Sequence, residues 1–176
     1  MKKVVLTFGL ISGVIIAALM WLMLALMNAG FTSHSLLIGY ATMIIALSLV
    51  FFGIKSYRDS NGGRITFFKG LQIGILISLI SGVCYGLSWE AYYRTSGGDF
   101  MQQYTVQYID EMRTKGSSED EIAKTQKEMD QFAEQYKNFF VRFGMTLMEI
   151  MPVGIVVTLI SAGLLRRKEL LPAEPA

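Results

Sequence analysis

Four long apolar segments constrain the fold of this chain more than any other feature. They cover residues 4–27, 36–54, 71–89 and 143–165, and Glu149 is the one charged residue within them. A bilayer hydrocarbon core about 30 Å thick is crossed by roughly 20 helical residues. Lipid offers no hydrogen bonds to the backbone, so each segment must satisfy its own as an α-helix. The sequence therefore predicts an all-α integral membrane four-helix bundle, a single domain over residues 1–176.

The composition argues against several classes of function. Hydrophobic residues make up 52% of the chain and charged residues 17%, whereas about 25% are charged in a typical soluble domain. The single cysteine, Cys84, excludes an intrachain disulfide, and the single histidine, His34, disfavours a zinc site. No basic surface indicates nucleic acid, and no Ser/His/Asp or Cys/His set indicates catalysis. We predict a non-enzymatic protein with no cofactor, no metal site and no nucleic-acid partner.

Lysine and arginine residues in the short loops predict the orientation. Nine of them lie in the N-terminus, the loop between the second and third segments, and the C-terminal tail, whereas residues 28–35 contain none. Short loops rich in Lys and Arg stay in the cytoplasm. The first apolar run is longer than that of a signal peptide, so we interpret it as a retained anchor. We expect both termini on the inner side of a bacterial cytoplasmic membrane and the polar segment 90–142 outside.

That polar segment has the pattern of an outer helical hairpin at about residues 99–140. Asp99 is placed to cap a first helix, and Gly116 to end it. Large residues recur in the first helix at four-residue spacing, namely Phe100, Tyr104, Tyr108 and Met112. The sequence therefore predicts an amphipathic helix that ends in a short Gly-Ser turn.

A second helix is predicted to begin at Ser118, which forms a capping box with Glu121. Its apolar face is expected to comprise Ile122, Met129, Phe132, Ala133, Tyr136 and Phe140. Two interpretations of the hairpin stay open. Either the two apolar faces bury each other, or part of the Tyr- and Met-rich stripe presents a groove to a protein partner or ligand.

The third apolar segment carries a ridge of small residues, each four apart: Gly70, Gly74, Ser78, Gly82 and Gly86. Small residues at this spacing let helix backbones approach closely in lipid. The first and fourth segments have similar residues, including Gly13 and Gly154. We interpret the ridge as a packing surface within one bundle, and a seam between two copies of the chain is the alternative.

The carboxylate of Glu149 stands out because it lies inside the fourth apolar segment. A charge near the bilayer centre costs on the order of 2–3 kcal/mol and normally faces a bundle interior or a partner. Pro152 follows three residues later and is expected to kink the helix. Glu149 is either structural or a proton, cation or ligand acceptor. Arg142, Glu90 and Arg94 are expected to join it in one polar cluster.

Three motifs resemble a bacterial membrane family catalogued as domain of unknown function 4199. They are GGRITFFKG at residues 62–70, GDFM at residues 98–101 and EIMPVG at residues 149–154. The resemblance covers nearly the whole chain. It implies a four-helix integral membrane protein, and it supplies no activity, cofactor or catalytic residue.

The sequence predicts a structural or interaction subunit that presents the outer hairpin. The expected partners are the lipid bilayer, a protein at the hairpin and a second copy of the chain. The alternative is a small transporter or ion-coupled membrane protein that uses the intramembrane carboxylate of Glu149.

Overall fold

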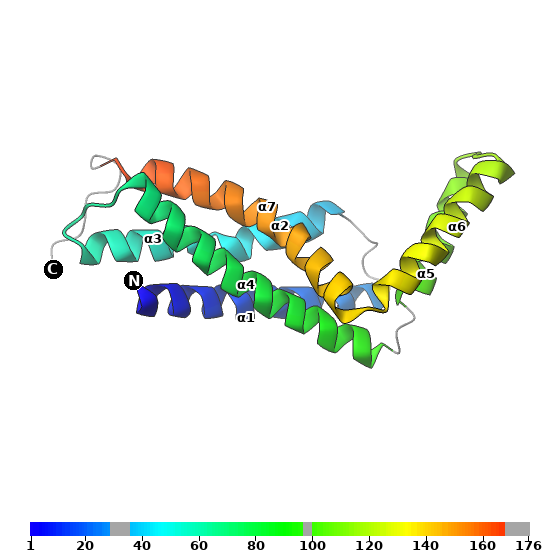
Figure 1. The fold of residues 1–176 in the computed structure, drawn as a ribbon, viewed down its shortest axis with the longest axis horizontal. Coiled ribbons are helices and arrows are strands. Elements are labelled where there is room, and N and C mark those ends of the chain that lie inside the picture. Colours follow the sequence, from blue (N-terminus) through cyan, green and yellow to red (C-terminus); the bar gives the residue numbers. More distant parts are fainter. Residues whose placement is uncertain (29–35, 97–99, 168–176) are drawn as a thin grey trace. The chain divides into compact units, whose positions relative to one another are not determined.

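The computed structural model describes residues 1–28, 36–96 and 100–167. Over these residues the chain forms seven helices and no strand (Figure 1), which confirms the all-α prediction. The helices are α1 (Lys2–Asn28), α2 (Leu36–Leu47), α3 (Leu49–Ser60), α4 (Phe67–Thr95), α5 (Phe100–Thr114), α6 (Glu119–Tyr136) and α7 (Phe139–Leu165). The predictions for His34, for the cap at Asp99 and for Lys168 lie outside the described residues.

Four stretches of helix are long and apolar enough to cross a membrane. They are Lys2–Leu26, Leu37–Ser60, Phe67–Thr95 and Phe139–Leu165. Each of them extends past its predicted segment at one end or both, because hydrophobicity marks only the part of a helix that lipid can cover. The second stretch continues six residues beyond 54, and the third begins four residues before 71 and ends six after 89.

The second stretch is irregular at Ser48, which separates α2 from α3. The Ser48 hydroxyl donates a hydrogen bond to the Ile45 carbonyl at 2.7 Å. The Phe51 amide donates to the Ser48 carbonyl, three residues back instead of four. A serine that bonds its own preceding turn in this way typically bends a helix.

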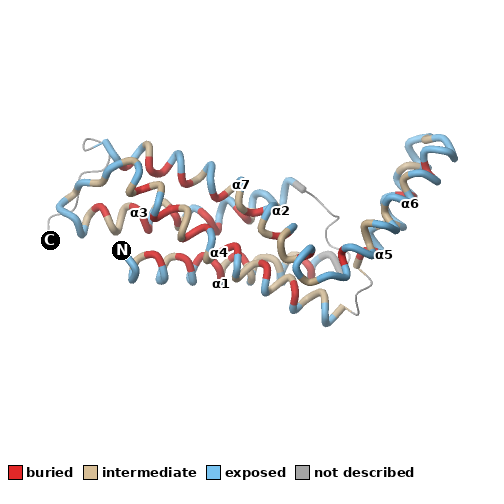
Figure 2. Tube along the Cα trace, in the orientation of Figure 1, coloured by how far each residue is buried: buried red, intermediate tan, exposed pale blue. Residues whose placement is uncertain are grey.

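Residues 1–86 and those from 146 onward form one compact unit, in which α1, α2, α3, most of α4 and most of α7 make a helical bundle. Its core consists of buried aliphatic residues from each helix, and Figure 2 marks the buried positions along the chain. They include Val5, Ile16, Leu47, Val50, Ile54, Ile73, Ile77, Ile150 and Leu165. The start of α1, the α3–α4 turn and the end of α7 lie at one end of this bundle (Figure 1).

Helices α4 and α7 run antiparallel along a seam of small residues. Gly70 lies against Ala162, Gly74 against Thr158, Ser78 against Gly154, and Gly82 against Ile150. A methyl group on Gly74 would lie 2.7 Å from Oγ1 of Thr158, closer than van der Waals contact permits. The predicted ridge therefore contacts α7 of the same chain, and its last residue, Gly86, is also buried.

Helix α1 packs against α4 in the same manner, but parallel to it. A methyl group on Gly13 would lie 2.6 Å from Cβ of Cys84. Two buried serines add hydrogen bonds between helices: Ser12 donates to the Ala46 carbonyl at 2.8 Å, and Ser81 to the Gly9 carbonyl at 3.3 Å. These bonds satisfy hydroxyl groups that would otherwise be costly to bury.

Residues 87–145 form the second compact unit. Within it α5 and α6 lie side by side (Figure 1) and are joined by a turn at Gly116, which has φ 80°. The Ser117 amide donates to the Met112 carbonyl and the Gly116 amide to the Arg113 carbonyl, both at 3.0 Å. This is a Schellman ending, in which glycine adopts the left-handed conformation at low cost. The predicted terminating role of Gly116 is confirmed.

The predicted capping box at the start of α6 is also confirmed. The Ser118 hydroxyl accepts a hydrogen bond from the Glu121 amide, and the Glu121 carboxylate accepts one from the Ser118 amide. The cluster of acidic residues in the first turn suits the positive end of the helix dipole.

The predicted apolar face of α6 was wrong at Phe140. Helix α6 ends at Tyr136, so Phe140 belongs to α7, where its side chain is 80% exposed. The break occurs because the Asn138 side chain accepts a hydrogen bond from the Phe140 amide at 2.9 Å, the geometry of a helix N-cap. This capping asparagine begins a new helix and interrupts the four-residue pattern.

Candidate functional site

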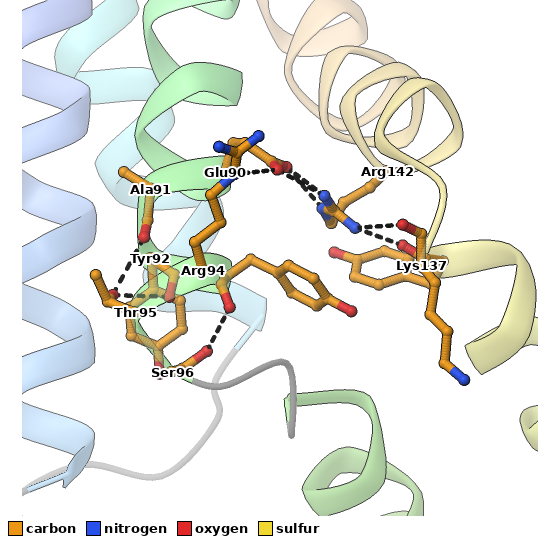
Figure 3. Close-up of polar contacts among 10 residues, drawn as sticks. Glu90, Ala91, Tyr92, Arg94, Thr95, Ser96, Lys137 and Arg142 are labelled. Carbon is orange, nitrogen blue, oxygen red and sulfur yellow. Dashed lines mark hydrogen bonds and ion pairs between the residues drawn. The ribbon is translucent and has the colours of Figure 1, made fainter.

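The most highly organised polar site of the second unit is an ion pair between Glu90 near the end of α4 and Arg142 near the start of α7 (Figure 3). The Arg142 Nε donates to Glu90 Oε2 at 2.8 Å, and Nη2 donates to Oε1 at 2.7 Å and to Oε2 at 2.6 Å. The side chain of Arg142 is 4% exposed and that of Glu90 is 10% exposed. Paired donors of this fork geometry give the strongest hydrogen bonds between arginine and carboxylate.

Arg142 also holds the C-terminal end of α6 (Figure 3). Its Nη1 donates to the carbonyl oxygens of Tyr136 at 2.7 Å and Lys137 at 3.3 Å. A helix does not provide backbone donors for the carbonyls of its last turn, so donors from elsewhere are needed at this end. One guanidinium therefore joins three elements of this unit: α4, the end of α6 and the start of α7.

Aromatic rings enclose this guanidinium. Its central carbon lies 3.9 Å from the centre of the Tyr93 ring, a close cation–π contact. Tyr93 meets Tyr136 edge-on, with ring centres 5.8 Å apart. The Trp89 indole donates to the Tyr136 hydroxyl at 2.7 Å. The sequence placed Trp89 and Tyr93 in a general interfacial belt, whereas the structure gives each a specific contact.

Arg94 completes the cluster one turn beyond Glu90. Its Nε donates to Glu90 Oε1 at 3.0 Å (Figure 3), while its side chain is 74% exposed. A second, exposed pair lies nearby, where Lys137 donates to the Glu134 carboxylate at 2.6 Å. This hydrogen bond raises the pKa of Lys137 above its ordinary value. The buried charges of the site are thus paired with each other, and the arrangement holds the ends of these helices together.

The structure brings together three of the four predicted cluster residues, Glu90, Arg94 and Arg142. Glu149 lies two helical turns after Arg142 and belongs to the bundle unit. Its side chain is exposed, and among the described residues no hydrogen bond or ion pair to it is found. Pro152, also exposed, lies within α7 as predicted.

The aromatic stripe of α5 is only partly buried. The residues of α5 that are fully buried are Met101 and Ile109, whereas Tyr104 and Tyr108 are 40% and 42% exposed. Their rings follow one another with centres 6.3 Å apart and nearly parallel planes. Val106, on another side of the helix, is 56% exposed. The Tyr stripe therefore lies beside the buried face of α5, at an edge that is only partly covered.

The chain matches the family described as "Protein of unknown function (DUF4199)" over residues 7–167. It belongs to this family. The match confirms the resemblance seen in the three sequence motifs. Comparisons with curated proteins and with solved structures return no match. The family description names no activity, so what this DUF4199 protein does must be argued from its geometry.

The bundle unit of this DUF4199 protein contains a buried arginine that was not predicted from the sequence, where it counted only as a loop charge. Arg58, in the last turn of α3, is 1% exposed. Its Nε and Nη2 donate to Asp59 Oδ1 at 3.0 and 2.9 Å, and Lys55 donates to Asp59 Oδ2 at 2.7 Å. The Asp at its side was the available signal, since Arg is rarely buried without a carboxylate partner. Among the described residues no group of three His, Cys, Asp or Glu is placed to hold a metal ion.

Proposed function

We propose that this protein is a multi-pass protein of the bacterial cytoplasmic membrane, with both termini inside and α5–α6 forming an outer helical hairpin. Two observations support this orientation. The short segments rich in Lys and Arg lie at the end of the bundle that holds the start of α1, the α3–α4 turn and the end of α7. The opposite ends of α4 and α7 lead into the polar unit at residues 87–145. This arrangement follows the positive-inside rule.

A labelling experiment tests the orientation. A cysteine at position 126, an exposed residue of α6, is introduced in a Cys84→Ser background. We expect a membrane-impermeant maleimide to label it in cells whose inner membrane is intact. A matched cysteine at position 61, in the exposed α3–α4 turn, is expected to react only after that membrane is opened. The reverse pattern would exclude the proposed orientation.

We further propose that the protein is a non-enzymatic interaction subunit, and that the hairpin binds a protein partner outside the membrane. The supporting observation is the exposure of Tyr104 and Tyr108 on a helix already packed against α6. Tyrosines are enriched at interfaces because they combine a large apolar ring with a polar end. The hairpin is also acidic, with eight Asp or Glu against four Lys or Arg over residues 100–136. A partner with a basic, apolar surface fits this chemistry.

Photocrosslinking from the α5 surface tests the interaction. A photoreactive residue at position 107, beside Tyr104 and Tyr108, is used in intact cells, and the captured protein is identified. We expect Tyr104→Ala with Tyr108→Ala to abolish the crosslink. The matched control, Gln102→Ala with Gln103→Ala, changes two exposed polar residues of the same helix and should retain it. Equal crosslinking in all three proteins would contradict a Tyr-dependent interface.

Ion-coupled transport through Glu149 is the second candidate function, because this carboxylate lies within an apolar span and has no hydrogen-bond or ion-pair partner in the part of the chain that the structure describes. A route through the bundle would require polar groups inside it. In the described parts of the bundle the buried polar side chains are serines, threonines and Arg58, with no buried carboxylate. Interaction is therefore favoured. Loss of a proton- or ion-linked activity in Glu149→Gln, with the hairpin crosslink retained, would favour transport instead.

A further inference from the structure

The outward position of Glu149 carries an inference about a second surface, distinct from the hairpin. Glu149 lies on the side of α7 that faces away from the bundle. Its exposed neighbours include Met148, which is 77% exposed, and Val156, which is 54% exposed. The residue after it, Ile150, is buried against Gly82 of α4. An ionisable group in this position would face lipid unless another molecule covers it.

Pro152 adds a second hydrogen-bond acceptor to the same surface. Proline has no amide hydrogen, so the carbonyl of Met148 cannot receive the usual bond from residue 152. The carboxylate of Glu149 and this carbonyl belong to adjacent residues. The surface therefore offers two acceptors and, at these positions, no donor.

Within residues 1–28, 36–96 and 100–167, no Lys or Arg forms a hydrogen bond or ion pair with Glu149. Arg142 donates to Glu90 and to two carbonyls of α6. Gly82 marks the level of Glu149 on α4, and the nearest cations along that helix are Lys69 and Arg94. At 1.5 Å per residue each lies about 18–20 Å from that level. Two copies inserted in the same direction keep equal depths, so a second copy brings neither cation to Glu149.

We propose that the α7 surface formed by Met148, Glu149 and Pro152 is an intramembrane docking site for a transmembrane helix of another protein, one that carries Lys or Arg at the depth of Glu149. The charge complementarity is specific, because such a side chain provides the donors that both acceptors lack. Within membranes, ionisable residues pair with one another for this reason. The inference rests on the proposed membrane placement but is independent of the hairpin and of the orientation.

The test uses designed peptides and the full-length protein. Three Leu-rich transmembrane peptides of about 20 residues are compared. The first has a single Lys at the depth of Glu149, the second has this Lys displaced by two helical turns, and the third has no Lys. Energy transfer from the labelled protein is measured in phosphatidylcholine vesicles. We expect the level Lys peptide to associate at least tenfold more tightly than the other two. Glu149→Gln should remove this preference, and Met148→Leu should retain it.

A charge exchange distinguishes recognition from a folding defect. Glu149→Lys combined with a peptide that carries Glu at the same depth should restore association. Equal affinity for all peptides, or a preference that persists in Glu149→Gln, would overturn the proposal. So would energy transfer between copies of the protein that disappears in Glu149→Gln, since a second copy would then cover the surface. Alkaline extraction of the same vesicles tests the membrane placement separately.

Discussion

Removing one partner of the Glu90–Arg142 pair is the sharpest test of the site. The variants are Glu90→Leu, Arg142→Leu and the two together. In either single variant the remaining charge keeps a side chain that was at most 10% exposed and loses its buried partner. In Arg142→Leu the carboxylate of Glu90 retains only the exposed Arg94. A buried charge without its partner is strongly destabilising, whereas replacing both charges by apolar groups is often nearly neutral. The pair should therefore show a large coupling energy.

The magnitude follows from the contacts. Each single variant should lower the free energy of unfolding of the second unit, residues 87–145, by about 3–5 kcal/mol. The double variant loses the hydrogen bonds to the Tyr136 and Lys137 carbonyls but leaves no buried charge. It should therefore cost only about 1–3 kcal/mol, less than either single variant. The matched control is Arg113→Leu, which removes an exposed pair with Asp110 and should cost less than about 1 kcal/mol.

Trp89 provides the assay. The chain has two tryptophans, so a Trp21→Phe background leaves Trp89 as the reporter of the second unit. Its indole is bonded to Tyr136 and meets the Phe100 ring edge-on at 4.9 Å, so its emission should shift when that packing is lost. Urea titrations of the full-length protein in detergent give the unfolding energies. The account of a buried pair would be refuted if each single variant lost no more unfolding free energy than the Arg113→Leu control. It would also be refuted if the loss in the double variant equalled the sum of the two single losses.

Three further substitutions test the packing and the helix ends. Gly74→Ala should lower the stability of the bundle by about 1–3 kcal/mol through overlap with Thr158, whereas Gly163→Ala, which meets nothing within 4 Å, should not. Thermal unfolding compares the two, and equal effects would exclude the close seam. Gly116→Ala should cost about 1–2 kcal/mol because φ is 80° there, measured as faster amide exchange at the end of α5. Ser118→Ala should cost about 1 kcal/mol and speed exchange in the first turn of α6, while Ser118→Asp should not. Unchanged exchange in the alanine variant would argue against the cap.

Much of the fold could be predicted from local sequence signals. Apolar length identifies the four spans, since a lipid-crossing helix must be long and uncharged. The end of α5 was predicted from Gly116, and the start of α6 from Ser118 with Glu121, because these signals act within one helical turn. The break at Asn138 was missed because the apolar pattern seemed to continue through it to Phe140.

The candidate site was harder to predict because its partners are distant in sequence. Glu90 and Arg142 are 52 residues apart. Glu149 was predicted as a site residue because a charge inside an apolar segment can be recognised from the sequence alone. Pairing across helices depends on the register of α4 against α7, and hydrophobicity does not specify that register.

The register of α4 against α7 has a physical explanation in the spacing of small residues and of charges along the two helices. The contacts advance four residues on α4 as they retreat four on α7, from Gly70–Ala162 through Gly82–Ile150. Within the second unit the same two helices carry the Glu90–Arg142 pair. The small residues alone are degenerate, because a slip of four residues would still set Gly82 against Gly154 and Gly74 against Ala162. Within the second unit a slip of four residues would move Arg142 from Glu90 to the level of Arg94, replacing an attraction by a repulsion. Buried polar groups are known to fix register at some cost in stability. The glycine seam thus allows close approach of α4 and α7 in the bundle unit, and the ion pair selects one register within its own unit.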